Sequence, residues 1–297
     1  PGLINNKVKI SRHLHEKLSH LPKDQSQRRV LTFLPTEAGA AYHMDDNNDF
    51  WNVTIYIEDS QTFETVSDQR VAYEGGKLFG EFIRLTQDFD ASNLVEVIPR
   101  FHNMTFRFEQ FEEALKNASD DRLLKTEGLT GMTKDLKKEM LILQELKDSG
   151  QIKLRVTHND TKISNALFDK EGKGRCVIDT DTIMPGIIHY DFGDAIRTIC
   201  NTAAEDETDL EKVNFNKEFY QAYSRGFLEN IGDSVSEFEK KYFPLAAKTM
   251  IFIMALRFLT DYLSNDIYYK IKYPEHNLHR SRNQFKLIES FEQVMTE

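Results

Sequence analysis

RVTHNDTKISNALFD at residues 155–169, followed closely by GRCVIDTDTIMPG at residues 174–186, is the part of this sequence that decides the fold. Each stretch contains a short apolar run and then becomes polar, as a strand does where it leads into a loop. The first loop contains His158, Asp160 and Asn165. We therefore expect two short strands whose ends present these polar side chains as one constellation.

The second strand is predicted to end at Asp179 and Asp181, 19 and 21 residues after Asp160. Transfer of a nucleotide phosphoryl group needs a carboxylate that orients and deprotonates the attacking hydroxyl, and oxygen ligands that hold magnesium on the phosphates. Asp160 suits the first role, and Asn165 with Asp179 suits the second. Asp181 is either a further metal ligand or a side chain that stabilises a turn. We expect His158 to brace the loop backbone rather than to accept a proton.

The composition is that of a globular protein with a sizeable core. The 297 residues suffice for one large or two modest domains, and 40% of them are hydrophobic and 29% charged. The formal net charge of -10 argues against sequence-independent binding of nucleic acid, because such binding needs a basic surface. We therefore expect no nucleic-acid partner.

The cysteines suggest a reducing compartment. Cys176 and Cys200 are the two cysteines of the chain, and neither a CxxC motif nor a histidine cluster accompanies them. The sequence therefore predicts neither a disulfide framework nor a zinc site, and the cytoplasm fits best. The chain starts at Pro1 without a basic and apolar leader, so no secretory signal is expected.

The longest apolar stretch, residues 245–263, is interrupted by Lys248, Arg257 and Asp261. A helix that spans a membrane needs about 20 consecutive, predominantly apolar residues. We therefore expect a buried helix here, and no membrane partner.

The N-terminal part predicts one helix and two strands. Residues 3–21 place leucine, isoleucine and valine at helical spacing until Pro22 ends the pattern. Residues 29–34 and 49–58 are rich in β-branched and aromatic side chains, and a polar loop separates them. We expect these two runs to form an antiparallel pair.

From about residue 65 the sequence becomes mainly helical, so the predicted class is α+β. Residues 152–157 and 175–178 predict the two short strands of the polar constellation, and Gly172 and Gly174 would turn the chain between them. The predicted helices cover residues 75–86, 105–117, 134–149, 215–230, 237–263 and 280–295.

The polar motifs resemble those of a known superfamily. HNDTKISN at 158–165 is similar to the HxDxxxxN catalytic loop of the aminoglycoside phosphotransferase and choline kinase superfamily, and VIDTD at 177–181 resembles its metal-binding strand end. The N-acetylhexosamine 1-kinase branch is the most similar part of that superfamily. The likeness to this branch extends over IPRFHNMTFRF (98–108), DTDTIMPG (179–186), YDFGDAIR (190–197), RFLTDYL (257–263) and KYPEHNLHRSRNQFKLIES (272–290).

The resemblance implies a protein-kinase-like fold with two lobes. Residues 1–58 would be the remnant of a small β-rich N-terminal lobe, with a helix and two strands. Residues 59–297 would form a large, mainly helical C-terminal lobe with the catalytic loop and the acceptor pocket. ATP would bind between the lobes, where Tyr56, Ile57 and Glu58 would contact adenine through main-chain groups.

The resemblance also implies roles for four further residues. Asp191 and Asp194 would support the catalytic loop from beneath. Arg257 and Tyr268 match a stretch that lines the sugar pocket of the N-acetylhexosamine kinases, although a buried, salt-bridged arginine and a core tyrosine are equally compatible with the sequence. The implied activity is ATP- and Mg²⁺-dependent transfer of a phosphoryl group to a small-molecule hydroxyl, in particular the anomeric hydroxyl of an N-acetylhexosamine.

The N-terminal region departs from the family pattern. Family members begin with three strands that carry a phosphate-covering loop and a lysine for the nucleotide phosphates. This sequence contains no GxGxxG motif, and no strand with a lysine precedes the first helix, so Glu16 would lack a lysine partner. We expect a truncated small lobe, with a naturally reduced lobe as the alternative, and weak or lost activity of the chain as given.

Three other functions stay open on the sequence. VIDTDTIMPG also fits the DxDxT pattern of haloacid-dehalogenase phosphatases, with Asp179 as nucleophile and Asp181 as general acid/base, although mainly helices follow the motif. The acceptor could be choline, an aminoglycoside or another small alcohol. The missing lysine also allows a kinase-like binding protein without turnover. A protein kinase is disfavoured, because no APE-like anchor follows VIDTD.

Overall fold

A computed structural model describes residues 1–296 of the chain. Runs of helices and runs of short strands follow one another along it, which agrees with the predicted α+β class. The chain divides into two compact units, and the predicted catalytic loop lies in unit 1. The boundary predicted after residue 58 stays a prediction. Unit 1 comprises Pro1–Pro99, Leu154–Asp191 and Glu218–Lys240, and unit 2 comprises Arg100–Lys153, Phe192–Lys217 and the described residues from Lys241 on.

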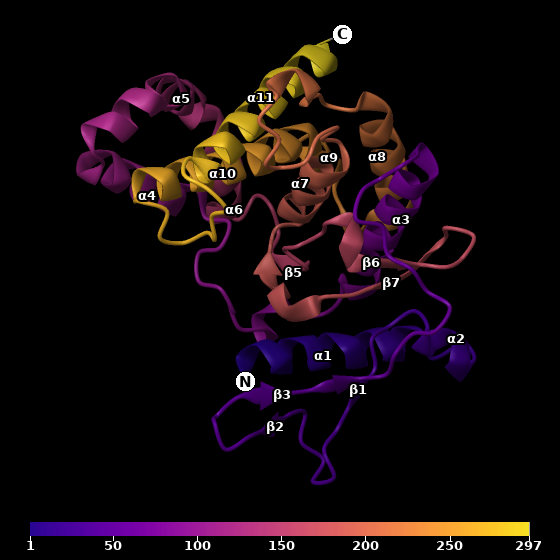
Figure 1. Cartoon of the computed structure of the whole chain (residues 1–297). Helices are drawn as coiled ribbons and strands as arrows, with labels where there is room; N and C mark the ends of the chain where they lie inside the picture. Colours follow the sequence, from indigo (N-terminus) through magenta and orange to yellow (C-terminus); the bar gives the residue numbers. More distant parts are fainter. Residues whose placement is uncertain (297) are drawn as a thin grey trace. The chain divides into compact units, whose positions relative to one another are not determined.

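Figure 1 shows the elements in chain order from indigo to yellow. The α-helices are α1 (Gly2–Lys17), α2 (Lys23–Gln27), α3 (Gln69–Thr86), α4 (Met104–Asn117), α5 (Asp120–Met140), α6 (Ile142–Asp148), α7 (Ile188–Ile199), α8 (Lys217–Ile231), α9 (Glu237–Lys240), α10 (Phe243–Leu263) and α11 (His276–Thr296). The short 3₁₀ helices are η1 (Ala91–Asn93), η2 (Ile163–Asn165), η3 (Thr180–Thr182), η4 (Leu210–Lys212) and η5 (Gly232–Ser234). The strands are β1 (Phe33–Leu34), β2 (His43–Met44), β3 (Phe50–Trp51), β4 (Val53–Thr54), β5 (Arg155–Thr157), β6 (Ala166–Phe168), β7 (Gly174–Val177) and β8 (Met184–Gly186).

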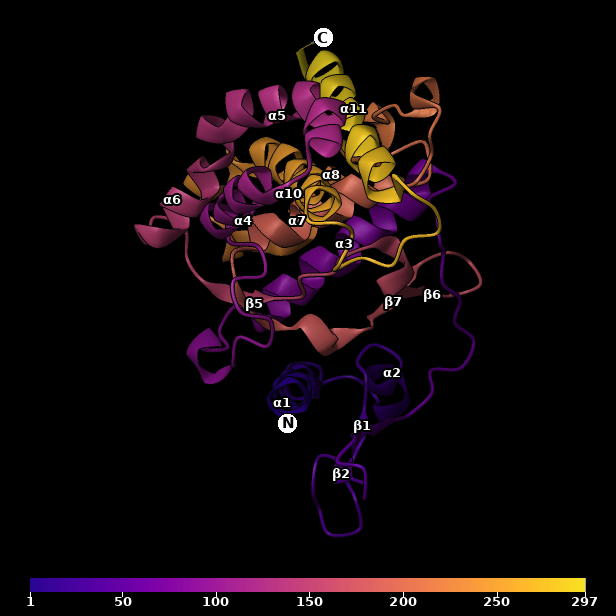
Figure 2. The same ribbon diagram turned by 60° about the vertical axis from the view of Figure 1, so that its left-hand side comes forward.

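The first helix forms as predicted but ends four residues early, at Lys17. Proline disfavours the helical conformation of the residue before it, so the chain leaves the helix ahead of Pro22. Pro22 then precedes the short helix α2 with an extended backbone. The Ser11 hydroxyl of α1 donates to the carbonyl of Leu31, 2.5 Å away, and Figures 1 and 2 both show α1 beside β1. This contact holds α1 against the strand segment that follows it.

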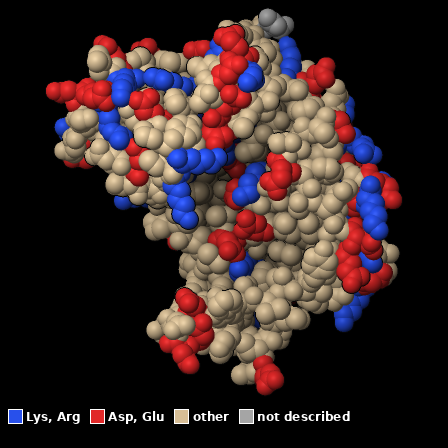
Figure 3. Space-filling model, in the orientation of Figure 1, with Lys and Arg blue, Asp and Glu red and all other residues tan. Residues whose placement is uncertain are grey.

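The predicted antiparallel pair in the N-terminal region is confirmed, because β1 pairs with β4. A second pair, β2 with β3, joins the predicted polar loop to the beginning of the predicted strand 49–58. This hairpin is closed by Asp45, whose carboxylate accepts hydrogen bonds from Asn47 N, Asp49 N and Trp51 Nε1. Acidic side chains, coloured red, gather over the hairpin at the bottom of Figure 3. Over the rest of that visible face, acidic and basic side chains are interspersed.

Two further antiparallel pairs frame the polar constellation in unit 1. Strand β5 pairs with β8, and β6 pairs with β7. Gly172, with φ of +76°, turns the chain ahead of β7 as predicted, but the strand before the turn is β6, which the sequence analysis did not predict. Gly174 instead lies within β7. The pairing places the loop after β5 and the loop after β7 next to each other.

Several helix boundaries differ from the prediction for identifiable reasons. Helix α3 begins at Gln69 rather than at residue 75, because the Asp68 carboxylate caps it through the backbone N–H groups of Arg70 and Val71. The helix predicted for 237–263 is split into α9 and α10, because proline is tolerated in the first turn of a helix but not in its interior, and Pro244 marks the start of α10.

Helices α3 and α8 approach closely in unit 1 because glycines face each other. A Cβ atom on Gly76 would overlap the carbonyl oxygen of Tyr223, and one on Gly226 would overlap the carbonyl oxygen of Tyr73. Any larger side chain would force the two helices apart. This close contact fixes the position of α3. Phe79 and Phe82 of the same helix pack against His158 of the predicted catalytic loop.

Helix α10 is the core helix of unit 2. By length and composition it could cross a membrane, but 72% of its most apolar window is buried within the fold, against helices that include α4 and α11. Buried helices of soluble proteins have this composition. The sequence prediction of a buried helix here is confirmed.

Candidate active site

Asp191 holds the loop that follows β5. Its two carboxylate oxygens accept hydrogen bonds from the backbone N–H groups of His158 and Asn159, at 2.8 Å each. Asp191 lies in the first turn of α7 and is 1% exposed. A buried carboxylate that receives two backbone N–H groups fixes the loop strongly, because leaving these donors unpaired would cost about 1–3 kcal/mol each. The structure thus shows Asp191 bound to the backbone of this loop.

His158 connects this loop to the end of β7. Its Nε2 lies 2.8 Å from the carbonyl oxygen of Ile178, and its Nδ1 lies 3.3 Å from the backbone N–H of Asp160. With this geometry Nε2 donates and Nδ1 accepts, which assigns the neutral tautomer. The ring also packs edge-on against Phe79 and Phe82 of α3. His158 therefore supports the backbone of the loop through both ring nitrogens.

Asp160 presents a carboxylate that is oriented by its neighbours. Asn165 Nδ2 donates to Asp160 Oδ2 at 2.9 Å and to the Asp160 carbonyl at 2.8 Å. The short helix η2 returns the chain over Asp160 and so brings Asn165 into reach. The Asp160 side chain is 33% exposed, which leaves it accessible to a substrate hydroxyl.

Lys162 is a residue of this site that the sequence analysis missed. Its Nζ lies 3.0 Å from Asp160 Oδ2, and its side chain is 42% exposed. The signal that could have identified it is its place two residues after the candidate base, inside the polar loop. An exposed ammonium group beside the base offers a positive charge to an incoming phosphate.

Asp179 follows β7 in the left-handed backbone region, with φ of 54° and ψ of 56°. A residue other than glycine is strained there by about 1–3 kcal/mol, and such strain is concentrated at functional sites. Within residues 1–296 the Asp179 carboxylate has no hydrogen bond or ion pair, and the residue is exposed. Ile178 N donates to the Asn165 carbonyl at 2.9 Å, so Asp179 follows directly on the segment bound to Asn165.

Asp181 is already engaged by a cation. Lys7 Nζ of α1 lies 2.6 Å from Asp181 Oδ1, and the lysine side chain is 10% exposed. Asn6, next to Lys7, donates from Nδ2 to the carbonyl of Ile183 at 2.8 Å. The beginning of α1 therefore anchors the loop that carries Asp179 and Asp181. Of the two carboxylates, Asp179 is the one without a competing partner in the described chain.

The donor set fits magnesium better than zinc. Among residues 1–296, no three His, Cys, Asp or Glu side chains come together to hold a metal ion on protein ligands alone. Magnesium keeps several water molecules and is usually bound by one or two carboxylates together with substrate phosphates. Asp179 and the Oδ1 atom of Asn165 would hold it here. Asp181 could join them only if Lys7 released it.

The segment predicted as the hinge follows β4 in unit 1. Tyr56 is 79% exposed and Ile57 is buried. The carbonyl of Ile57 accepts a hydrogen bond from the Ser60 hydroxyl at 2.7 Å. Ile57 and Glu58 also line a polar cavity of about 210 Å³, together with residues that include Asp169. An adenine ring that binds here would find the carbonyl oxygen of Ile57 already engaged by the Ser60 hydroxyl.

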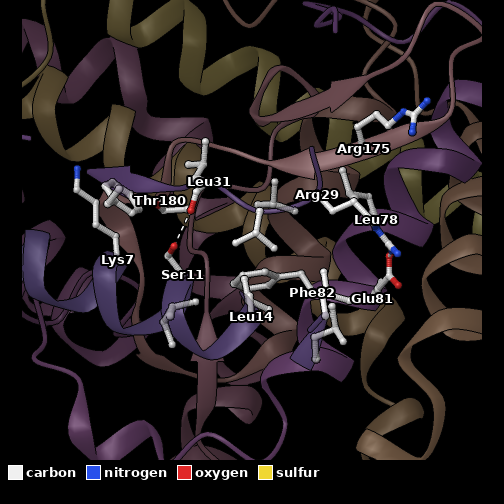
Figure 4. Close-up of a pocket in the computed structure, with 16 residues that line it drawn as sticks. Lys7, Ser11, Leu14, Arg29, Leu31, Leu78, Glu81, Phe82, Arg175 and Thr180 are labelled. Carbon is white, nitrogen blue, oxygen red and sulfur yellow. Dashed lines mark hydrogen bonds and ion pairs between the residues drawn. The ribbon is translucent and has the colours of Figure 1, made fainter. Parts of the chain in front are cut away.

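An apolar cavity lies between α1 and α3 in unit 1 (Figure 4). Lys7 and Thr180 lie at one end of it, and the ion pair of Arg29 with Glu81 lies at the other. Its volume of about 40 Å³ is close to the roughly 30 Å³ that one water molecule occupies in the liquid, which is far too small for a nucleotide. The cavity is therefore a packing gap in the core rather than a nucleotide site.

The remaining predicted residues lie in unit 2. Asp194 accepts two hydrogen bonds from Arg197, one turn later on α7, and both side chains are largely buried. Arg197 in turn bonds Glu205 at 2.9 Å. Asp194 thus takes part in an ion-pair network at the C-terminal half of α7.

Arg257 and Tyr268 lie together at a cavity in unit 2. Arg257 has no acidic partner within the described chain, and its guanidinium carbon lies 5.8 Å from the centre of the Tyr268 ring. Tyr268 is 70% exposed. The alternative of a buried, salt-bridged arginine and a core tyrosine is therefore wrong, because Tyr268 is mostly exposed and Arg257 has no salt bridge within the described residues.

Comparison with known proteins agrees with this geometry. The model of a phosphotransferase enzyme family (APH) matches residues 10–232. The fold is similar to an aminoglycoside phosphotransferase from Alicyclobacillus acidocaldarius, with a TM-score of 0.59 and 15% identity over 96% of this chain and 84% of that chain. It is also similar to an amicoumacin kinase in complex with AMP-PNP, Ca²⁺ and Ami (TM-score 0.57, 13% identity, 99% of this chain and 81% of that chain). A choline kinase from Streptococcus pneumoniae has a TM-score of 0.50 and 13% identity, over 95% of this chain and 80% of that chain.

These identities are low, so the likeness to solved structures concerns the fold. The predicted protein-kinase-like fold is confirmed by it. The family match extends through the predicted catalytic loop and the strand end that follows it, which removes the haloacid-dehalogenase alternative.

Proposed function

Because the chain belongs to the phosphotransferase enzyme family, we propose that it transfers the γ-phosphoryl group of ATP to a hydroxyl of a small molecule, with Asp160 as the general base. The observation that carries this proposal is the fixed position of the Asp160 carboxylate. Asn165 orients it directly, and Asp191 holds the backbone on its N-terminal side. A base must be positioned before it can accept a proton efficiently.

In the proposed reaction, Asp160 accepts the proton of the attacking hydroxyl as the oxygen bonds to the γ-phosphorus. The bond from that phosphorus to the bridging oxygen breaks, and ADP leaves with the electron pair. Lys162 lies beside Asp160 and offers a positive charge to the transferred group. Bound magnesium would neutralise phosphate charge, and Asp179 with Asn165 Oδ1 would hold it. Tyr56, Ile57 and Glu58 would contact adenine through main-chain groups.

Replacing Asp179 by Ala is expected to weaken Mg²⁺-dependent nucleotide binding by at least about tenfold, because a hard cation loses its unpaired carboxylate. The matched variant Asp181→Ala should have a smaller effect, since Asp181 is paired with Lys7. Titration of a fluorescent ATP analogue with and without Mg²⁺ measures both. A larger loss in Asp181→Ala than in Asp179→Ala would move the metal role to Asp181.

Replacing Lys162 by Ala is expected to lower kcat by roughly 10²-fold, because a cation that faces the developing phosphate charge is worth about that much. Lys240→Ala is the matched control, since Lys240 is an exposed lysine paired with Glu237 away from the loop. Steady-state ADP release measures kcat for both. Equal kcat values in the two variants would remove Lys162 from the mechanism.

For the acceptor, we propose the anomeric hydroxyl of an N-acetylhexosamine or a related sugar. Support comes from the similarity of five sequence stretches to the N-acetylhexosamine kinases and from the cavity at Arg257 and Tyr268. Choline or an aminoglycoside is the alternative acceptor. Both cysteines are buried and unpaired, which supports a reducing compartment such as the cytoplasm.

A further inference from the structure

Unit 2 contains two arginines that share one cavity and lack acidic partners in the described chain. Arg107 of α4 and Arg257 of α10 line a cavity of about 180 Å³, together with Tyr268 and Tyr269 from the connection between α10 and α11. Neither guanidinium forms a salt bridge within residues 1–296. Half-buried charges are normally paired, so two unpaired cations in one cavity need an explanation.

The hydrogen bonds of the two guanidinium groups are far from saturated. Arg107 donates to Gln110 Oε1 at 2.7 Å and to the carbonyl of Phe101 at 2.6 Å, and its Nε is buried without a partner. Within the described chain, the one side-chain hydrogen bond of Arg257 goes to Met254 Sδ, a weak acceptor, at 3.5 Å. Each guanidinium has five N–H donors, so several donors remain for a ligand.

Aromatic rings complete the cavity. The guanidinium carbon of Arg257 lies 5.3 Å from the centre of the Phe101 ring, 5.8 Å from that of Tyr268 and 5.5 Å from that of Tyr269. These rings hold the arginine by cation–π attraction and leave its N–H edge for hydrogen bonding. Tyr268 and Tyr269, which line the cavity, also offer flat apolar faces to a sugar ring.

The carboxylate at this cavity does not balance the two cations. Asp261 is 4% exposed, and its oxygens accept hydrogen bonds from Tyr268 N, Tyr269 N and Asn277 Nδ2. Asp261 therefore fixes the connection that carries the two tyrosines. Burial and then the positive charge of Arg257 lower the pKa of Arg107 to about 10, which is the behaviour of a cation short of negative charge.

We infer that this cavity binds the anionic group of an organic ligand, with Arg107 and Arg257 on its oxygens and the tyrosines against its ring. Guanidinium groups bind carboxylate and phosphate oxygens through paired, charge-assisted hydrogen bonds. A neutral ligand would leave both charges uncompensated. Binding at this cavity of unit 2 does not depend on the proposed function. Only the further step that its ligand is the acceptor, which would then be an acidic sugar, rests on that function.

The test compares two sugars that differ only at C6, where glucuronate has a carboxylate and glucose has a hydroxymethyl group. Isothermal titration calorimetry on the wild-type protein is expected to show glucuronate binding at least about tenfold more tightly than glucose. Added salt should reduce this preference, because the two charges attract through partly solvated space. Equal affinities for the two sugars, or tighter binding of glucose, would overturn the inference.

Three variants test whether the preference for glucuronate over glucose arises at this cavity. Arg107→Gln and Arg257→Gln should each bring the two affinities to within about threefold, and Arg257→Lys should retain part of the preference because it keeps the charge. Lys116→Gln is the control: it removes a charge from the same helix at an exposed position, where Lys116 is 72% exposed. Circular dichroism establishes that each variant is folded. Retention of the full preference in both folded glutamine variants would overturn the inference.

Failure of this inference can be distinguished from failure of the proposed function. If glucuronate is preferred in binding but no acceptor of any class supports ADP release, the inference stands and the proposed function fails. If a neutral N-acetylhexosamine is phosphorylated while glucuronate shows no preference over glucose, the proposed function stands and the inference fails.

Discussion

Replacing Asp160 by Asn is expected to lower kcat by roughly 10²–10⁴-fold, the contribution of a positioned general base. Asparagine has the same shape and can still accept the hydrogen bond from Asn165, but it cannot take the proton of the acceptor hydroxyl. The affinity for Mg²⁺ and ATP should remain within about twofold, because the base acts on the acceptor and not on the nucleotide. A coupled assay of ADP release and a nucleotide titration measure the two quantities separately.

Glu237→Gln is the matched control for this prediction. Glu237 is an exposed carboxylate in unit 1 that pairs with Lys240 at 2.7 Å, so its replacement removes one surface charge without touching the loop. Its kcat should equal that of the wild type. Unchanged turnover in Asp160→Asn would contradict the assignment of the base, and equal losses in both variants would indicate a general effect of charge.

Replacing Arg155 by Ala is expected to destabilise the protein by about 3–5 kcal/mol, the usual effect of removing one partner of a buried ion pair. Arg155 NH1 lies 2.6 Å from Glu239 Oε1, and the two side chains are 8% and 5% exposed. Arg155 also donates to the carbonyl of Ser234 at 2.7 Å. Its loss would leave a buried carboxylate without its counter-charge. Urea denaturation, followed by circular dichroism, measures the change in free energy of unfolding.

Two comparisons establish that the unpaired charge causes this loss. Lys240→Ala removes a partner from an exposed pair with Glu237, and should change stability by less than about 1 kcal/mol. The double variant Arg155→Met with Glu239→Gln should recover much of the loss, because it removes both charges together. A loss below about 1 kcal/mol in Arg155→Ala would contradict the structural role of this pair.

The pH dependence of stability follows from the same pair. Burial opposes ionisation of Glu239, but hydrogen bonds from Arg155 and Ser236 outweigh it and lower the pKa of Glu239 from 4.5 to about 2. A carboxylate with a lowered pKa in the folded state stabilises the protein above its unfolded pKa, and this contribution is lost as the pH falls towards the folded value. The wild type should therefore lose stability between about pH 4.5 and 2, and Arg155→Ala should lose less in that window.

The sequence predicts most reliably the features that depend on local pattern. The polar loop with Asp160 and Asn165 was identified from residue types and spacing, and the buried helix within 245–263 from its apolar composition. Helix α5 was predicted only from residue 134, because Gly128 and Gly131 weaken the helical propensity of its first part.

The features that the sequence does not reveal are contacts between distant segments. The pairing of β5 with β8 brings the two loops together, but the same apolar runs would suit other pairings. Lys7 lies 174 residues before Asp181, and nothing near it indicates that the two side chains meet. The hairpin of β2 and β3 depends on the hydrogen bonds of Asp45, which a polar stretch does not distinguish from an ordinary loop.

The most direct test of the central claim is acceptor-dependent ADP release by the protein in its full natural length, with Mg²⁺ and ATP. The acceptors would be N-acetylhexosamines, neutral and acidic hexoses, choline and an aminoglycoside, and phosphate on the product would be located by NMR. We expect ADP release that requires one of the sugars, and a phosphate on its anomeric oxygen. Release that requires choline or the aminoglycoside would retain the phosphotransferase and correct the acceptor. Folded protein that binds Mg²⁺ and ATP but releases ADP with none of these acceptors would contradict the account.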